Sequence, residues 1–240
     1  MSFLIPQWPA PANVKAVVTT RNGGISQAPY NGFNLAAHVG DAPEAVAHNR
    51  AQLSGFGCTP VWLNQVHSID VVPAVAGQLA TADASFTEEP GLACTVLTAD
   101  CLPVLFTTLQ GDRVAAAHAG WRGLAGGILE ATACALKANP DEILVWLGPA
   151  IGPTAFEVGP EVYETFIAQH PEAEQALIAS ARVGHFYADL YQLARIRLAA
   201  IGITRVFGGD FCTFSDARFY SYRRQAQTGR MASLIWLDQP

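Results

Sequence analysis

The sequence predicts a layered α/β (α+β) fold in which a mixed β-sheet is flanked by helices. Apolar runs of strand length recur between turn signals, and stretches with helical periodicity lie between them. Several runs are apolar throughout, which is typical of strands covered on both faces, so we expect a sheet sandwiched between helices. The expected strands are Val14–Thr20, Val61–Val66, Leu92–Leu97, Leu102–Thr107, Val114–His118, Ile143–Leu147, Arg205–Phe207 and Leu234–Leu237.

The expected helices follow recognisable start and stop signals. The first begins at Asp41 and Pro43 and ends at Leu53, before two glycines. The second follows His118, where apolar side chains recur at helical spacing as far as Ala135. The others are Pro160–Gln169, Glu172–Ala181 and Tyr187–Gly202. No repeat, low-complexity tract or linker divides the chain, so we expect one domain spanning residues 1–240.

Composition narrows the classes of partner. Half of the 240 residues are apolar, only 14% are charged, and the formal net charge is −6. Because there is no block of like charge, a protein that tracks a nucleic-acid backbone is not expected. A small-molecule substrate is the default expectation.

The sequence also predicts a cytoplasmic protein. Residues 1–18 contain three prolines and no basic segment, unlike a signal peptide. The longest uncharged stretch, Ile143–Phe156, is shorter than the roughly 18 to 20 residues of a membrane span, so no membrane partner is expected. Five irregularly spaced cysteines favour free thiols in a reducing compartment.

Three residues with metal-ligating side chains are expected at strand ends, where layered folds carry function. His67 ends one expected strand, Cys101 lies between two others, and His118 ends a fourth. Two imidazoles and a thiolate suit a Zn²⁺ ion that keeps a fourth position open for water. Their spacing is not a local chelate motif, so two alternatives stay open. Cys101 is then either a small core residue or a nucleophile with His118 as its base and no metal.

Acidic and basic residues near these positions are further candidates. Asp83 and Asp100 lie among small apolar residues, so each is expected to have a partner: it orients a ligand histidine, carries protons or caps a turn. The glycine-rich segment 120–127 follows a strand, and its backbone N–H groups with Arg122 are candidates for holding an anion. Arg21 and Arg223 are two further candidates. The segment matches no dinucleotide or Walker A motif.

Five motifs resemble the bacterial YfiH-like family, also called the laccase-domain or polyphenol-oxidoreductase family. They are Asn64-Gln65-Val66-His67, Thr98-Ala99-Asp100-Cys101-Leu102-Pro103-Val104, Ala117-His118-Ala119-Gly120-Trp121-Arg122-Gly123, Leu147-Gly148-Pro149-Ala150-Ile151-Gly152-Pro153 and Gly229-Arg230-Met231-Ala232-Ser233. The likeness extends from Val14 to Trp236.

The resemblance implies a single-domain layered α/β fold with zinc on His67, Cys101 and His118. It also implies phosphorolysis of adenosine, inosine, guanosine and methylthioadenosine, and deamination of adenosine. The family carries an older label as a copper polyphenol oxidase and a link to peptidoglycan-precursor editing. Because the chain has six histidines but no His-x-His pair, a four-copper laccase is not expected.

The resulting hypothesis is a zinc-dependent purine nucleoside enzyme, with copper as a substitute ion. Asp83 or Asp100 would move protons. Gln65 and one of Arg21, Arg122 and Arg223 would bind the nucleoside and phosphate. The alternatives are a metal-free Cys101–His118 hydrolase or amidase acting on peptidoglycan precursors, a copper polyphenol oxidase of another type, and a sensor that binds without turnover.

Overall fold

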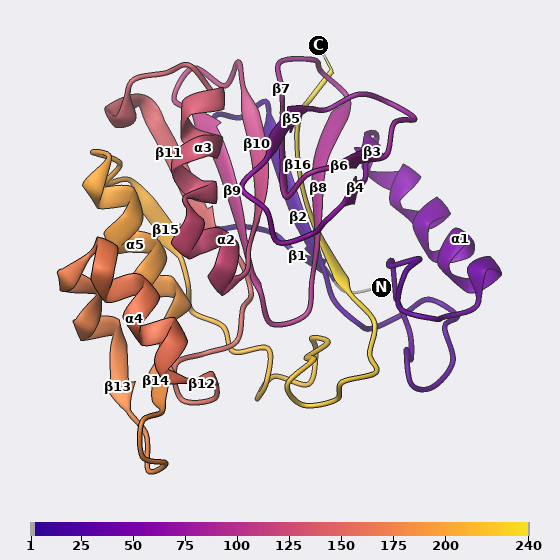
Figure 1. Ribbon diagram of the computed structural model, residues 1–240. Coiled ribbons are helices and arrows are strands. Elements are labelled where there is room, and N and C mark those ends of the chain that lie inside the picture. The colour runs from indigo at the N-terminus through magenta and orange to yellow at the C-terminus, as the bar shows by residue number, and fades with distance from the viewer. Residues whose placement is uncertain (1–2, 240) are drawn as a thin grey trace.

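The computed structural model describes residues 3–239 and contains two large β-sheets packed face to face (Figure 1). Helices and loops cover the outer face of each sheet, which confirms the predicted layered α/β class. The helices are α1 (Pro43–Ala51), α2 (Trp121–Gly126), α3 (Ile128–Ala135), α4 (Pro160–Gln169) and α5 (Leu190–Ala200), with 3-10 turns at Gln52–Phe56, Pro140–Glu142 and Pro171–Ala176.

The first large sheet has five strands in the order β1-β2-β16-β8-β3. All neighbours are antiparallel except β3 and β8, which are parallel. The strands are β1 (Phe3–Leu4), β2 (Val14–Thr19), β16 (Met231–Leu237), β8 (Leu92–Thr98) and β3 (Thr59–Val61).

The second large sheet has six strands in the order β15-β11-β9-β10-β7-β5. Its four central strands are antiparallel to their neighbours among these four. The edge strand β15 is parallel to β11, and the edge strand β5 is parallel to β7. They are β15 (Val206–Gly208), β11 (Ile143–Leu147), β9 (Leu102–Thr108), β10 (Val114–Ala119), β7 (Ala84–Thr87) and β5 (Val71–Pro73). Two small sheets complete the fold: β12 (Glu157–Val158), β14 (Phe186–Ala188) and β13 (Leu177–Ala179) form one, and β4 (Leu63–Asn64) pairs with β6 (Ala80–Thr81) in the other.

The space between the two large sheets is filled by apolar side chains from both. Val18, Val96 and Ile235 from the first sheet pack in one cluster with Leu105 and Val114 from the second. Every residue of β8, β9, β10 and β16 is buried. The continuous apolar runs therefore do mark strands covered on both faces. The expected cover was helices on each side, but a second sheet covers one face instead.

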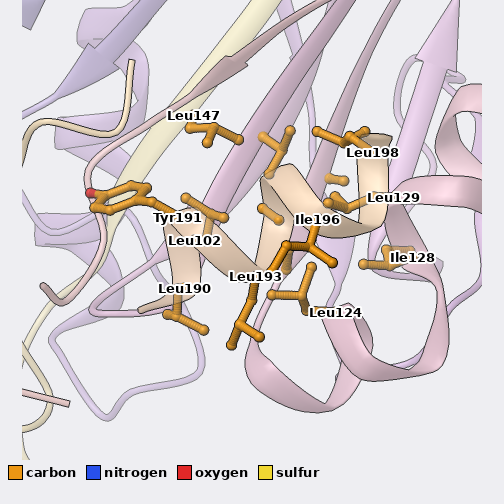
Figure 2. Close-up of a cluster of buried hydrophobic side chains, with 14 of the residues drawn as sticks. Leu102, Leu124, Ile128, Leu129, Leu147, Leu190, Tyr191, Leu193, Ile196 and Leu198 are labelled. Atoms are coloured by element: carbon orange, nitrogen blue, oxygen red, sulfur yellow. The ribbon is translucent and has the colours of Figure 1, made fainter. Parts of the chain in front are cut away.

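Helices α3 and α5 cover the outer face of the six-stranded sheet, and Figure 2 shows leucines of α5 packed against Leu129 of α3 and Leu102 of β9. The single helix expected after His118 is in fact two helices. It breaks at Gly127, whose backbone φ of 106° is accessible to glycine and strained for other residues.

Three other expected elements differ from the structure. The strand predicted at Val61–Val66 is interrupted at Trp62, and after Asn64 the chain enters a turn. The helix predicted at Glu172–Ala181 is a 3-10 turn followed by β13, because Leu177–Ala179 pairs with β14. The last helix starts at Leu190 rather than Tyr187, since the Asp189 side chain accepts backbone hydrogen bonds from Tyr191 and Gln192 and caps it there.

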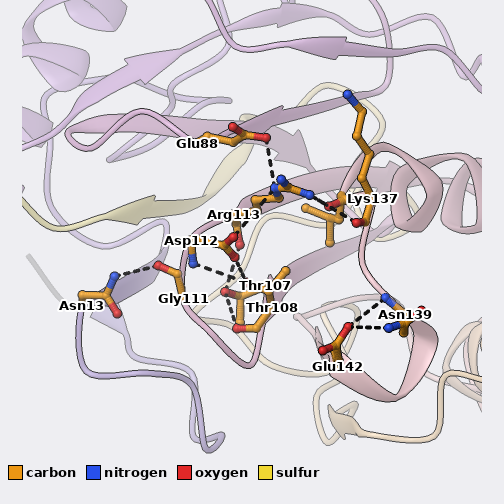
Figure 3. A network of polar contacts seen from close by, with 11 residues as sticks. Asn13, Glu88, Thr107, Thr108, Gly111, Asp112, Arg113, Lys137, Asn139 and Glu142 are labelled. Carbon is orange, nitrogen blue, oxygen red and sulfur yellow. Dashed lines mark hydrogen bonds and ion pairs between the residues drawn. The ribbon is translucent and has the colours of Figure 1, made fainter.

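A polar network closes the sandwich at the turn between β9 and β10 (Figure 3). Arg113 lies 3.0 Å from the Glu88 carboxylate and donates to the Leu136 carbonyl at 2.6 Å. Thr108 donates to Asp112 at 2.5 Å. These contacts hold the turn against α3 and leave the opposite ends of the strands to form the site described below. None of the helices within residues 3–239 is long and apolar enough to cross a lipid bilayer.

Removal of one α5 side chain tests the helix layer. Leu193 is 1% exposed, and Leu193→Ala is expected to lower the free energy of unfolding by about 2–5 kcal/mol through lost burial and a cavity. Leu79→Ala makes the same chemical change at a residue that is 67% exposed, and its expected cost is within about 0.5 kcal/mol. Urea denaturation measures both. Equal costs would show that α5 does not stabilise the sheet in this way.

Candidate metal centre

Cys101 lies where the chain passes from one large sheet to the other. It is in the short connection between β8 of the five-stranded sheet and β9 of the six-stranded sheet. The preceding residue, Asp100, has a left-handed backbone with φ of 88°. Such a conformation costs free energy in a non-glycine residue and persists where surrounding contacts enforce it. The connection thus turns sharply and places Cys101 at the end of the sandwich.

His118 reaches the same end from β10, and the neighbouring strand supplies its partner. Because Ala117 pairs with Ala84 of β7, Asp83 lies directly beside His118. The His118 backbone N–H donates to the Asp83 carbonyl at 2.7 Å, and its Nδ1 lies 2.7 Å from the Asp83 Oδ1. The second ring nitrogen, Nε2, is thereby left to act as a ligand, as is usual for metal-binding histidines paired with a carboxylate.

His67 is held in a turn, so the expectation that it ends a strand is wrong. The carboxylate of Asp83 accepts hydrogen bonds from the backbone N–H groups of Val66 at 3.1 Å, His67 at 3.0 Å and Ser68 at 2.6 Å. These bonds draw the chain out of strand geometry, and His67 takes a left-handed φ of 62°. Its ring projects toward Cys101.

The three side chains fit a single metal ion. Their ligand atoms all lie within 4.8 Å of one another, and His67 Nε2 is 3.9 Å from Cys101 Sγ. A tetrahedral zinc ion holds nitrogen and sulfur ligands about 3.4 to 3.6 Å apart, so the donor atoms are close to the required spacing. The two imidazole rings meet edge to face with centroids 4.7 Å apart.

Gly120 leaves room for this cluster. A Cβ atom at position 120 would lie 2.9 Å from the His67 ring and 3.1 Å from Cys101 Sγ. A glycine is therefore required where the chain leaves β10 and enters α2. The next residue, Trp121, lines the same site.

The cluster is electrostatically coupled. Burial raises the pKa of the Cys101 thiol, but the charges and hydrogen bonds of His118 and His67 outweigh burial and leave it below the usual range. Burial lowers the pKa of His118, while Cys101 and Asp83 raise it above the usual range. Burial also raises the pKa of Asp83, but its hydrogen bonds to His118 and to the backbone of Ser68 and Val66 lower it to about 2. A metal site requires a deprotonated Cys101 and an ionised Asp83. It also requires a neutral His118, so a bound ion would take the place of the proton on that ring.

The cluster opens into a cavity of about 300 Å³. The size is at the lower end of small-ligand sites. The lining residues are His38, Gln65, His67, Leu97, Thr98, Ala99, Asp100, Cys101, His118, Trp121, Ile151, Phe156, Leu190, Tyr222, Arg223 and Arg230. Trp121, Phe156 and Tyr222 are aromatic, so the cavity combines the three candidate metal ligands with flat apolar surfaces.

The carboxylate of Asp100 is occupied on both oxygens. Oδ1 accepts from the Thr213 hydroxyl at 2.6 Å, and Oδ2 accepts from the Arg223 backbone N–H at 2.6 Å. Asp100 therefore fastens residues 213–223 over the end of the sheets. Asp83 likewise has both oxygens in hydrogen bonds. These contacts favour positioning by both acids over the proton transfer that the sequence hypothesis assigned to one of them.

The structure brings one of the three predicted arginines to the cavity. Arg223 lines it, and its guanidinium donates to the Glu157 carbonyl at 3.0 Å. Arg21 lies over the Tyr220 ring and Arg122 stacks on Trp121, and neither is among the cavity-lining residues. The predicted role of each in substrate binding stays a prediction.

Gln65 lines the cavity with its amide already engaged. It accepts from the Leu97 N–H at 2.7 Å and donates to the Leu97 carbonyl at 2.9 Å. This pair of bonds ties the His67 turn to the end of β8. Substrate contact by Gln65 stays a prediction.

Sequence reasoning missed three polar lining residues: His38, Thr98 and Arg230. Arg230 lies in the Gly229-Arg230-Met231-Ala232-Ser233 motif, and Thr98 begins the motif that contains Cys101. Both motifs had carried the family resemblance, so the signal was present. What the sequence lacked was the pairing of β8 with β16, which brings the two motifs together.

The chain is similar to known proteins over nearly its whole length. The model of the family described as multi-copper polyphenol oxidoreductase laccase matches residues 15–238. A protein of Pseudomonas aeruginosa named a purine nucleoside phosphorylase is 60% identical, with 99% of each chain covered. The purine nucleoside phosphorylase YfiH of Escherichia coli is 52% identical, with 98% of each chain covered.

Two solved structures are similar over nearly their full lengths. Protein NMB0706 of Neisseria meningitidis matches with a TM-score of 0.97 at 52% identity and covers 100% of both chains. YlmD from Geobacillus stearothermophilus matches with a TM-score of 0.92 at 30% identity, covering 100% of this chain and 97% of its own.

A methyl group at position 120 tests the metal centre. Gly120→Ala is expected to abolish stoichiometric metal binding, because the added Cβ would lie 2.9 Å from the His67 ring and 3.1 Å from Cys101 Sγ. Gly55→Ala is the matched control, since a Cβ there meets no atom within 4 Å. Metal content after zinc loading and gel filtration, measured by plasma mass spectrometry, compares the two. A folded Gly120→Ala protein with a full zinc complement would contradict the assignment.

The carboxylate that orients His118 is tested separately. Asp83→Asn replaces one of the two accepting oxygens with an NH₂ group. Either His67 N–H and His118 Nδ1, which share Oδ1, or the Val66 and Ser68 N–H groups on Oδ2 then lose their acceptor. Zinc affinity is expected to fall about 10–100-fold, the usual effect of removing such a partner. Competition with a chromophoric chelator gives the affinity, and circular dichroism verifies the fold. An unchanged affinity in a folded variant would argue against this role.

Proposed function

The chain belongs to the YfiH-type family described as multi-copper polyphenol oxidoreductase laccase, and from this premise we propose that it is a zinc-dependent purine nucleoside phosphorylase. The membership agrees with the resemblance found in the sequence. The relatives named purine nucleoside phosphorylases support an enzyme of this type. The observation that carries the proposal is the convergence of His67, Cys101 and His118 at the floor of a cavity with aromatic walls.

In this proposal His67, Cys101 and His118 hold the ion. When bound, the ion supplies Lewis-acid polarisation of a substrate atom and activation of water. Asp83 fixes the His118 ring through Nδ1 and the His67 turn through its backbone. The two ligands from separate segments are therefore held before substrate arrives, which is what a preorganised site needs.

The walls of the cavity suit a nucleoside. Trp121, Phe156 and Tyr222 offer aromatic faces on which a purine stacks. Leu97 and Ile151 supply further apolar surface. The Arg223 guanidinium lies 5.4 Å from the centre of the Phe156 ring and contributes positive charge to the wall. Such a wall suits a neutral base beside an anionic co-substrate.

Phosphorolysis exchanges two bonds at the ribose. A phosphate oxygen bonds to the anomeric carbon as the bond from that carbon to the purine nitrogen breaks, and the electron pair leaves with the base, which takes up a proton. The products are a free purine and ribose-1-phosphate. Closing such a cavity around the substrate excludes water, which would otherwise compete with phosphate.

A second activity at the same site is deamination of adenosine, which the family resemblance implies. An ion held by His67, Cys101 and His118 alone would have room for water, as catalytic zinc sites do. It would supply the water activation that hydrolysis of the exocyclic amine needs. The two activities give different products from one substrate.

A metal-free hydrolase is the competing interpretation, because Cys101, His118 and Asp83 are also ordered like a nucleophile, base and orienting acid. The position of His67 favours the metal. Its Nε2 lies 3.9 Å from the Cys101 Sγ, although a nucleophile–base pair needs no second histidine at the sulfur. Copper in the same three-ligand site is an alternative identity of the ion.

One incubation tests the proposal. Adenosine with the zinc-loaded enzyme is expected to give adenine and ribose-1-phosphate only when inorganic phosphate is present, as read by mass spectrometry. Inosine would reveal deamination. Cys101→Ser is expected to lose zinc and turnover together, whereas Cys134→Ser, at an exposed cysteine of α3, is expected to keep both.

Unchanged adenosine at high enzyme concentration would refute a nucleoside-cleaving function. Full activity in chelator-treated protein that is abolished by thiol alkylation would favour the hydrolase instead. Activity restored by copper but not by zinc would leave the reaction in place and change the ion.

A further inference from the structure

The cavity is lined from two sides that differ in character. Segments that follow strands of the six-stranded sheet, or cover that sheet, contribute the apolar side chains of Trp121, Ile151, Phe156 and Leu190. Segments joined to the five-stranded sheet form a second side, called the polar side below, with His38, Gln65 and Arg230. A nucleoside has the same asymmetry, because its purine is flat and its ribose carries hydroxyl groups. A purine stacked on the aromatic rings leaves its ribose for the polar side.

On the polar side, His38 has unused hydrogen-bonding atoms of both kinds. Both polar atoms of the Gln65 amide are bonded to the Leu97 backbone. The Arg230 guanidinium donates to two backbone carbonyls, and it has no acceptor atom. The Thr98 hydroxyl is buried beneath the surface. The ring nitrogens of His38 make no hydrogen bond to any group within residues 3–239, so its imidazole lines the cavity with a donor and an acceptor available.

The chain on both sides of His38 is held in place. Before it, Asn34 is 0% exposed and donates from its side-chain amide to the Asp41 carboxylate at 2.8 Å, which closes the loop that contains His38. After it, the Val39 carbonyl accepts from the Tyr30 hydroxyl at 2.6 Å. The loop is therefore ordered by its own contacts, while the imidazole takes part in none of them.

The same loop is fastened to its neighbours. The Asn34 side-chain oxygen accepts from the Arg230 backbone N–H at 3.0 Å, which ties the loop to the chain that enters β16. Arg50 of α1 donates from Nε to the Leu35 carbonyl at 2.8 Å. The position of the His38 ring relative to the polar side is thus set by the fold before a substrate arrives.

The surroundings of His38 favour its neutral form. Burial lowers the pKa of the ring, and the positive charges of Arg230 and Arg50 lower it further. His38 does not belong to the group of converging metal ligands, so its nitrogens are not committed to an ion. A neutral imidazole has one N–H donor and one nitrogen acceptor. A sugar hydroxyl also donates once and accepts, so the two groups are complementary.

We propose that His38 is a specificity-determining residue that holds a hydroxyl group of the ribose. The inference rests on the proposed nucleoside phosphorylase and adds the recognition of its sugar. An arginine only donates hydrogen bonds, whereas His38 also accepts the hydroxyl proton. With the purine stacked on the aromatic side and the ribose held by His38, both ends of the glycosidic bond are fixed. Such positioning presents the anomeric carbon to phosphate in one orientation.

Steady-state kinetics with adenosine and phosphate varied in turn provide the first part of the test. His38→Phe keeps a flat ring and removes both nitrogens, and it is expected to raise the KM for adenosine about threefold to tenfold. The KM for phosphate is expected to stay within about twofold, and zinc content is expected to stay unchanged. His38→Gln retains a donor and an acceptor and is expected to restore most of the loss. His48→Phe makes the same change at an exposed histidine of α1 and is the matched control.

The second part removes the hydroxyl groups of the substrate one at a time, with 2′-, 3′- and 5′-deoxyadenosine. Each analogue has the same intrinsic reactivity with both enzymes, so the ratio of its KM to that of adenosine isolates the lost contact. The wild type is expected to discriminate against the analogue that lacks the contacted hydroxyl, and His38→Phe is expected to lose this discrimination while it keeps the other two ratios. A merely structural role would weaken all four substrates equally or lower the thermal stability.

The two proposals fail in different ways. If the wild type makes no ribose-1-phosphate, phosphorolysis is refuted, and calorimetric titration of adenosine and the three analogues into zinc-loaded wild type and His38→Phe still decides whether His38 binds the sugar. If His38→Phe keeps all three wild-type ratios, this inference is overturned. An equal loss of affinity for free adenine would place His38 against the purine, and a selective rise in the KM for phosphate would place it at the co-substrate. Each of these results also overturns it.

Discussion

The buried carboxylate of Asp83 is the interaction on which the rest of the site depends. It is 0% exposed and accepts hydrogen bonds from three successive backbone N–H groups, Val66 to Ser68, while it also pairs with the His118 ring. A single side chain thus fixes two of the three metal ligands, which come from segments about 50 residues apart in the sequence. The burial of a charge is tolerable here because every oxygen has partners. The apolar sandwich supplies the dry surroundings that make those bonds strong.

Asp100 has a similar positioning role for Cys101, the third ligand, and for the loop that contains Thr213 and Arg223. Its strained backbone turns the chain from β8 into β9, and its carboxylate ties Thr213 and the Arg223 backbone to that turn. The loop from residue 209 to residue 230 therefore depends on a residue adjacent to Cys101. Cys101 lies between β8 and β9, which belong to different sheets, and the loop leads into β16 of the five-stranded sheet. A ligand that contacts both Cys101 and this loop therefore contacts segments connected to both large sheets. The site is rigid because it lies where the two sheets are joined.

The sequence predicted the parts of the fold that depend on local pattern. The runs at β2, β8, β9, β10 and β11 are rich in apolar residues, although Lys15 interrupts the run at β2. The structure contains strands there with bounds close to those expected. Failures occurred where a long-range contact overrides local pattern. His67 leaves strand geometry because Asp83 captures its turn, and Leu177–Ala179 becomes a strand because β14 is beside it. Neither contact has a signal within a few residues of the position that it changes.

The residues of the candidate site were likewise predicted only in part. Its metal ligands were found because cysteine and histidine at expected strand ends are chemically conspicuous, even though the reason given for His67 was wrong. Arg230 was overlooked because an arginine before an apolar strand is unremarkable until β16 is known to pair with β8. Its place on the cavity wall follows from that pairing, which is a property of three-dimensional packing alone.

The description of the family and the names of its members point to different chemistry, and the positions of the histidines help to decide between them. A multi-copper oxidase needs a trinuclear cluster in addition to a His₂Cys site, which requires several further histidines close together. Here His38 lines the cavity but is not in the group of converging ligand atoms, His48 is on α1, His170 follows α4 and His185 is in the β13–β14 hairpin. Within residues 3–239 only one group of three potential ligands converges. One ion cannot store the four electrons that a laccase delivers to oxygen, whereas cleavage of a nucleoside transfers none. The donor set therefore agrees with the names of the relatives rather than with the four-copper mechanism that the family description suggests.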